Sequence, residues 1–191
     1  RPFWIIAYLL SPLIPLSLYL AGLWSNLLEG WALSMAVGVF AYVWYLNQFI
    51  IAARPAYWEQ LYGLDRMYRF HGYMAIAATV MATVHIVIKR TTFPSITVQQ
   101  SFGIAAITVF VIVILATVIF MVQSHVARLR PVRRLRNYAA ERWRWQYHHL
   151  RRFHNLVVIA SFLVLAHVLI AFSTREALWR SAVMTLWFVV A

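Results

Sequence analysis

The sequence contains no cysteine, and only five of its 191 residues are acidic. Without cysteine, the chain can form no disulfide, thiolate zinc site or iron–sulfur cluster, and it has no cysteine nucleophile. None of the five carboxylates falls in the middle of an apolar run, so a relay of paired acids across a membrane is also excluded. Any cofactor chemistry must therefore depend on other side chains.

Charged residues are scarce as well, at 12% of the chain, whereas 63% of the residues are hydrophobic. A soluble domain is typically about 25% charged and roughly 45–50% apolar, so a soluble fold could not hide this much apolar surface. A helix needs about 20 mostly apolar residues to cross a bilayer. The sequence therefore predicts one compact all-α integral membrane domain, a bundle of six transmembrane helices in contact with membrane lipid.

Six apolar runs give the expected helices. Pro12 and Pro15 lie inside the first run and predict a kink there, which neighbouring helices can accommodate. The last run is short for a full span. The expected helices cover residues 2–23, 31–53, 68–88, 100–123, 150–172 and 177–191.

The net charge of +12 comes largely from arginines that cluster in two of the connections between these runs. A basic stripe for nucleic acid needs a soluble fold to carry it, so no nucleic-acid partner is expected. In membrane proteins, Lys and Arg accumulate in cytoplasmic loops. Both termini are thus predicted to be cytoplasmic, in a plasma membrane that we expect to be a bacterial inner membrane. The second connection carries Arg54, Arg66 and Arg69, and the fourth carries Arg128, Arg130, Arg133, Arg134, Arg136, Arg142, Arg144, Arg151 and Arg152.

The long basic connection over residues 125–153 has two interpretations. Its aromatic residues among arginines are typical of an amphipathic segment at the level of the lipid headgroups. The same charge could form a docking surface for a soluble redox domain or an acidic partner. His125, His148 and His149 lie in this connection, where exposed positions are expected.

Four histidines inside apolar runs are the main functional feature: His71 and His85 on the third helix, His154 and His167 on the fifth. Ionisable side chains at membrane depth are rare and usually functional, and imidazole is an axial ligand of haem iron. The separations of 14 and 13 residues correspond to roughly 21 and 20 Å along a helix axis. Two parallel helices would thus present two histidine pairs at matching depths. A single buried histidine more often only bonds a neighbour, but four with matched separations favour two stacked haems.

The angular positions fit this interpretation on one helix and strain it on the other. At 100° per residue, 14 residues return His85 to within about 40° of the face that carries His71. Thirteen residues leave His167 roughly 140° from His154 on an ideal helix. The fifth helix is therefore predicted to be distorted or tilted.

Cationic residues flank both histidine levels. Arg69 and Arg152 lie just before the cytoplasmic-side histidines, and Lys89, Arg90 and Arg175 lie just beyond the outer ones. Snorkelling of long side chains to the interface explains such positions without a further role. Haem propionates near an interface also need cationic partners, so these residues are candidate contacts for propionates or for an acceptor.

Two segments resemble the ferric reductase-like transmembrane domain, the family that includes NADPH oxidases and ferric reductases. They are GLDRMYRFHGYMAIAATVMATVHIVIK and ERWRWQYHHLRRFHNLVVIASFLVLAHVLIA, and the likeness extends over nearly the whole chain, residues 1–191. The family has two histidines separated by 13 residues on the third helix and two separated by 12 on the fifth. His71, His85, His154 and His167 reproduce both gaps.

The resemblance implies an oxidoreductase whose membrane part binds two b-type haems through these four residues. His71 and His154 would hold the inner haem iron, and His85 and His167 the outer one. Electrons would pass from cytoplasmic NAD(P)H and FAD through the inner and then the outer haem to an external acceptor, either dioxygen, giving superoxide, or ferric or cupric ions. Oxidases of the family often place an aromatic residue between the haems, whereas the middle of the fifth helix here is Val158, Ile159 and Ala160. Phe162 or the non-aromatic Met81 is the candidate to lie between the macrocycles.

The chain has no nucleotide-binding motif, although family members usually carry a C-terminal domain for FAD and NAD(P)H. Since the chain starts at Arg1 and stops inside an apolar run, we expect it to belong to a longer polypeptide or to receive electrons from a separate flavin dehydrogenase. One alternative is a cytochrome b subunit that exchanges electrons with quinone or free flavin for a partner protein. Another is a transporter whose histidines bind a metal, although such sites usually add carboxylates or broken helices.

Overall fold

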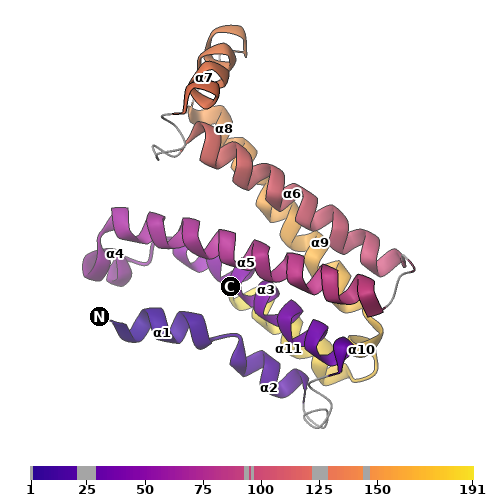
Figure 1. Ribbon diagram of the computed structural model, residues 1–191. Helices are drawn as coiled ribbons and strands as arrows, with labels where there is room; N and C mark the ends of the chain where they lie inside the picture. The colour runs from indigo at the N-terminus through magenta and orange to yellow at the C-terminus, as the bar shows by residue number, and fades with distance from the viewer. Residues whose placement is uncertain (1, 21–28, 93–94, 96, 122–128, 144–146) are drawn as a thin grey trace.

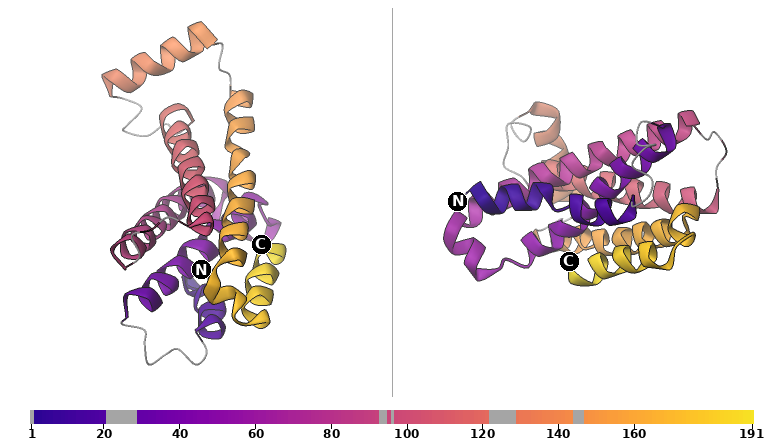
Figure 2. Two further views of the ribbon diagram at one scale, coloured as in Figure 1. Left: turned by 90° about the vertical axis from the view of Figure 1, so that its right-hand side faces the viewer. Right: turned by 90° about the horizontal axis from the view of Figure 1, so that it is seen from below.

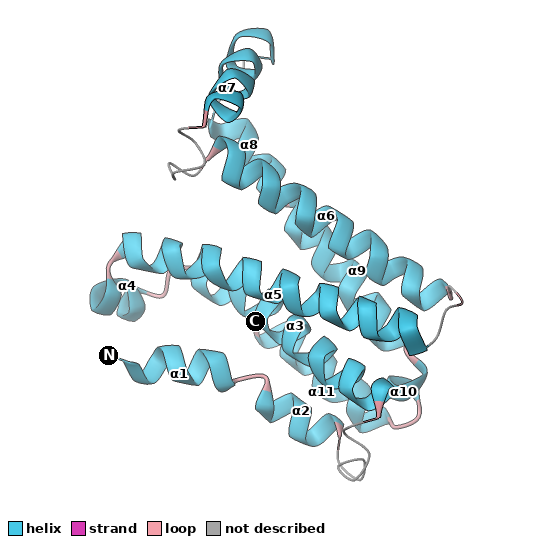
Figure 3. Cartoon of the chain, in the orientation of Figure 1, coloured by secondary structure: helices cyan, strands magenta, loops and turns pink. Residues whose placement is uncertain are grey.

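A computed structural model describes residues 2–20, 29–92, 95, 97–121, 129–143 and 147–191. All the regular elements in these described ranges are helices (Figure 3). They are α1 (Pro2–Leu10), α2 (Leu13–Tyr19), α3 (Gly30–Ala52), α4 (Ala56–Tyr62), α5 (Leu64–Thr92), α6 (Val98–Phe120), α7 (Arg130–Trp143), α8 (Tyr147–His154), α9 (Leu156–Ile170), α10 (Phe172–Arg175) and α11 (Leu178–Val190).

Four helical stretches are long and apolar enough to cross a membrane: α3, α5, α6 and the continuous stretch His148–Ile170 formed by α8 and α9. The first and last expected helices are present as shorter apolar helices, Phe3–Tyr19 and α11. The all-helical class that the sequence predicts is thus confirmed over the described residues, and four stretches have the length and composition of membrane spans.

The long helices form two pairs. α3 packs along α5, and α6 packs along α9, while α5 and α9 do not pack along each other (Figures 1 and 2). α2 and α11 also pack against α3. Tyr42 and Val43 of α3 and Met184 of α11 belong to the buried apolar cluster that they form there. The connection from α5 to α6 lies at one end of the bundle with α10, called here the α10 end. The starts of α5 and α8 lie at the opposite, α7 end (Figure 1).

The predicted kink in the first helix is confirmed. The chain turns at Ser11 and Pro12, which separate α1 from α2, because proline has no backbone N–H to continue the helical ladder. The Ser11 hydroxyl accepts a hydrogen bond of 2.8 Å from the Asn47 amide of α3. Asn47 in turn accepts one of 3.2 Å from the Trp187 indole of α11. A buried amide of α3 thus binds both the turn between α1 and α2 and the helix α11.

The predicted distortion of the fifth helix is also confirmed. α8 ends at His154, and α9 begins at Leu156, with a turn at Asn155 between them. The Asn155 N–H reaches the Arg152 carbonyl at 3.1 Å, and the Val158 N–H reaches the Asn155 carbonyl at 3.0 Å. Such three-residue bonds wind the chain by about 120° per residue, so each recovers about 20° of the angular mismatch between His154 and His167.

The basic connection forms a helix, α7, that stands away from the apolar bundle (Figure 1). Its arginines Arg130, Arg133 and Arg134 are exposed, and the Arg136 guanidinium donates a hydrogen bond of 3.3 Å to the last carbonyl of α6, that of Phe120. The amphipathic helix that the sequence predicts is therefore present. His148 and His149 are exposed as predicted, with 3.1 Å between their Nε2 atoms. His125 lies outside the described residues.

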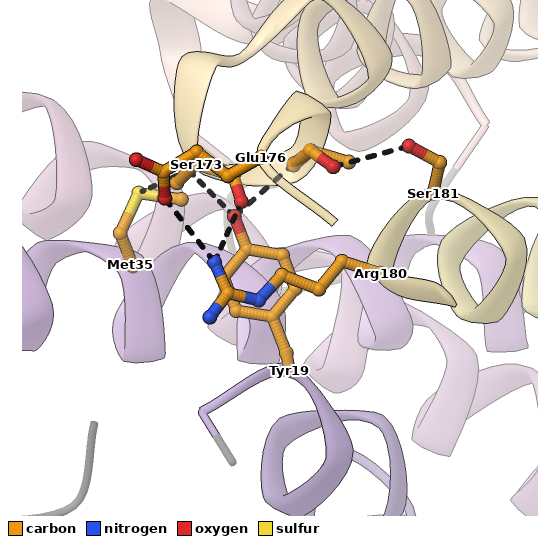
Figure 4. Close-up of polar contacts among 7 residues, drawn as sticks. Tyr19, Met35, Ser173, Glu176, Arg180 and Ser181 are labelled. Atoms are coloured by element: carbon orange, nitrogen blue, oxygen red, sulfur yellow. Dashed lines mark hydrogen bonds and ion pairs between the residues drawn. The ribbon is translucent and has the colours of Figure 1, made fainter. Parts of the chain in front are cut away.

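A buried arginine fastens α11 at the α10 end (Figure 4). Arg180 is only 8% exposed, and its guanidinium donates a hydrogen bond of 2.9 Å to the Ser173 carbonyl. The same group lies 5.5 Å from the centre of the Tyr19 ring. The Tyr19 hydroxyl shares hydrogen bonds of 2.6 and 3.1 Å with Ser173 and Thr174. These contacts join α2, α10 and α11.

Candidate functional site

The structure brings the four predicted histidines together as the two predicted pairs. The ring centroids of His71 on α5 and His154 on α8 lie 6.2 Å apart. Those of His85 on α5 and His167 on α9 lie 6.1 Å apart. The pair His71/His154 is at the α7 end, called here the inner pair, and His85/His167, the outer pair, is at the α10 end. Two helices that do not pack along each other therefore face each other at two levels through imidazole rings.

Both separations fit a metal ion held between two imidazoles. First-row metal–imidazole bonds are about 2 Å long, and the ring centre lies about 1.1 Å beyond the bonded nitrogen, so the two centroids of a bridged pair lie about 6.2 Å apart. The ring planes cross at 56° in the inner pair and at 87° in the outer pair, so the rings are not stacked on each other. Tilted and edge-to-face contacts at these distances also occur between rings that hold no metal, so the separations allow a bridging ion but do not require one.

The outer pair is oriented by backbone carbonyls. Nδ1 of His85 lies 2.7 Å from the Ser34 carbonyl of α3, and Nδ1 of His167 lies 2.7 Å from the Gln99 carbonyl of α6. A carbonyl only accepts hydrogen bonds, so both Nδ1 atoms must carry the proton. Nε2 of each ring is then left with a free lone pair, as a metal ligand requires.

The inner pair is held differently. Nδ1 of His154 lies 3.2 Å from the Thr117 hydroxyl of α6. Nδ1 of His71 is buried and has no hydrogen-bond partner among the described residues. An unpaired buried nitrogen is costly, which makes the inner pair the less strongly oriented of the two.

A mostly apolar cavity of about 110 Å³ contains the outer pair. It lies between the α3–α5 and α6–α9 pairs and extends to Tyr19 and Thr174 at the α10 end. Sites for cofactors are typically apolar clefts with a few placed polar groups. The apolar lining and the two imidazoles are of the kind that would hold a haem.

The cationic candidates separate into two groups. Lys89 and Arg90 line the cavity beside His85 and His167, as a contact with an outer propionate or acceptor would require. Arg69, Arg152 and Arg175 are exposed. The sequence analysis did not single out Arg180, although it is the buried cation at the α10 end. A cation in the first turn of a short apolar helix is the sequence feature that could have indicated it.

The aromatic residues between the two histidine levels differ from the prediction. Phe162 is 58% exposed and packs against Phe188, so it does not lie between the pairs. Met81 does not line the cavity of the outer pair. Tyr45 of α3 and Phe110 of α6 are stacked instead, with ring centroids 3.9 Å apart, and they cluster with Ala78 and Ala160, which are midway between the histidines of their helices. Tyr45 and Phe110 lie on helices that carry none of the four histidines, so the histidine spacing does not indicate them.

Comparisons of the chain with protein-family models, with curated proteins and with solved structures find no match. The candidate function consequently depends on the residues and the geometry alone. Over the residues that the structure describes, no three His, Asp or Glu side chains gather around one point.

Proposed function

We propose that the chain is the haem-carrying membrane part of an oxidoreductase, a six-helix bundle that conducts electrons across a membrane through two b-type haems. Its inner haem would be ligated by His71 and His154, and its outer haem by His85 and His167. Electrons would enter at the α7 end from NAD(P)H and FAD on a fused or separate dehydrogenase. They would leave at the α10 end to an external acceptor, dioxygen or a ferric or cupric ion.

The observation that carries the proposal is the pair of centroid separations, 6.2 and 6.1 Å, at the two ends of one apolar bundle. Haem iron supplies one-electron chemistry when bound, and the protein contributes ligands, spacing and electrostatics. Ser34 and Gln99 orient the outer ligands, while Lys89 and Arg90 place positive charge at the same cavity. The stacked Tyr45 and Phe110 place apolar rings beside Ala78 and Ala160, midway between the two levels.

An aromatic cleft at the α7 end supports a second candidate, electron exchange with a membrane quinone or free flavin. The cleft is about 370 Å³ and is lined by Trp4, Tyr8, Trp58, Arg66 and Phe70 among others. Phe70 precedes the inner ligand His71, and a planar carrier could stack on such rings. Reduction of the haems by a quinol, without a dehydrogenase, would favour this candidate over the first.

The test is a reduced-minus-oxidised visible spectrum of the purified protein with a haem-to-protein ratio. We expect b-type bands with a ratio near two, since each pair is predicted to hold one haem. His71→Ala and His85→Ala should each lose haem, whereas His148→Ala, which removes an exposed histidine, should retain both. A colourless wild-type protein from cells well supplied with haem would refute the proposal.

A further inference from the structure

Two glycines lie directly against the rings of the outer pair. A Cβ atom added to Gly38 of α3 would lie 2.8 Å from Nδ1 of His85, and one added to Gly103 of α6 would lie 2.8 Å from Nδ1 of His167. Real Cβ atoms essentially never come within 3.0 Å of another heavy atom. With any other residue at these positions, the imidazole would have to move.

The geometry of a helix explains why glycine is needed there. A Cβ leans toward the helix N-terminus and covers the carbonyls of the preceding turn. The acceptor carbonyls belong to Ser34 and Gln99, each four residues before its glycine. Each carbonyl has two lone pairs, so it can accept the helical hydrogen bond and a second one from the imidazole. The missing Cβ leaves the second lone pair open to the ring.

The same arrangement occurs twice, on different helices. Ser34 and Gly38 of α3 hold a histidine of α5, and Gln99 and Gly103 of α6 hold a histidine of α9. Each unit of glycine and open carbonyl is called here a glycine cradle. Each cradle lies on the helix that packs along the helix bearing its histidine.

The inner pair has no such cradle among the described residues. Nδ1 of His154 lies 3.2 Å from a threonine hydroxyl, and Nδ1 of His71 has no hydrogen-bond partner among the described residues. Gly72 of α5, adjacent to His71 in sequence, has no atom within 4 Å of an added Cβ. The cradles therefore distinguish the outer site from the inner one.

We propose that Gly38 and Gly103 are positioning residues that fix the donor strength and the orientation of the outer haem ligands. This inference rests on the proposed function. A hydrogen bond from Nδ1–H to a carbonyl makes Nε2 more basic, and a more basic ligand stabilises ferric over ferrous iron. The outer haem thus has the lower reduction potential of the two, because its ligands carry two such bonds and the inner ligands carry none.

The test compares Gly38→Ala and Gly103→Ala with Gly72→Ala by potentiometric titration of the haem bands and by the haem-to-protein ratio. Each cradle variant should move the lower-potential component to a more positive potential, or should lose one of the two haems, and should leave the higher-potential component unchanged. That unchanged component shows that the bundle is still folded. Gly72→Ala should leave both components at their wild-type potentials.

Two outcomes would contradict the proposed role of the glycines. Wild-type potentials and two haems in both cradle variants would overturn the role of the glycines and leave the proposed function intact. A shift of the higher-potential component in the cradle variants would likewise overturn it, because the cradles would then act on the inner haem. A wild-type protein that binds no haem would instead refute the proposed function and this inference with it.

Discussion

At the scale of residues, the two histidine pairs have different surroundings although they perform the same proposed task. His85 and His167 each donate to a backbone carbonyl, whereas His71 has no partner for Nδ1 and His154 faces a hydroxyl. The positions of all four could be predicted, because charge-bearing rings are conspicuous in apolar runs. Their hydrogen-bond partners could not be predicted. Every residue has a backbone carbonyl, so residue type does not show which carbonyl accepts the bond. Only the glycine four residues after each acceptor carbonyl indicates that the carbonyl is open to a histidine ring.

The stacked pair of Tyr45 and Phe110 leads to a prediction about stability. Phe110→Leu removes a ring that is 3.9 Å from its partner and nearly parallel to it, at 8°. Aromatic pairs contribute about 0.5–1.5 kcal/mol beyond the area that they bury. We expect Phe110→Leu to lower the thermal midpoint of the purified protein clearly, and Phe162→Leu, at an exposed ring, to change it little. Equal midpoints for the two variants would contradict a structural role for the stack.

At the scale of elements, most of the helices could be predicted, and the differences occur where short helices join the long ones. Length and apolar content define α3, α5 and α6 in the sequence, because a bilayer requires about 20 apolar residues. α4 and α10 are short and lie in connections, so no long apolar run in the sequence predicts them. The break at Asn155 was expected only because two histidines had to share a face, and the local sequence alone does not specify it.

The attachment of α11 provides a second prediction. Arg180→Ala removes a guanidinium that is hydrogen-bonded to Ser173 and lies over Tyr19. Hydrogen bonds to charged groups contribute about 1.5–3 kcal/mol, so we expect a loss of stability of about 2 kcal/mol. Its pair with Glu176, 3.5 Å away, adds little, because the Glu176 side chain is half exposed.

Arg54→Ala is the matched control, because Arg54 forms an exposed pair with Glu59 at 2.9 Å. The Glu59 carboxylate raises the pKa of Arg54 above its usual value, so the guanidinium keeps its charge. Thermal unfolding in detergent should show a lower midpoint for Arg180→Ala and almost none of that change for Arg54→Ala. A similar effect of both substitutions would show that the burial of Arg180 is unimportant.

At the scale of the whole molecule, charge is distributed unevenly between the two ends. The exposed arginines of α7 lie at one end, and the connection from α5 to α6 lies at the other (Figure 1). The positive-inside rule then predicts that the α7 end is cytoplasmic. The proposed direction of electron flow depends on that orientation.

The absence of cysteine makes the orientation easy to measure. Arg134→Cys would place a single thiol on the exposed face of α7, and Thr91→Cys would place one at the exposed end of α5. In right-side-out vesicles, a membrane-impermeant maleimide should label the thiol at position 91 directly and the thiol at position 134 only after lysis. The reverse pattern would invert the topology and, with it, the direction of electron transfer.

The separation of α5 from α9 also has a consequence for biogenesis. The two helices face each other through histidine pairs and do not pack along each other. If iron joins those pairs, the prosthetic groups take the place of direct packing between α5 and the α8–α9 stretch, beside the Tyr45–Phe110 stack that already joins the two halves of the bundle. Assembly would then finish with haem insertion, and a cell's haem supply would control how much of the newly made chain escapes proteolysis.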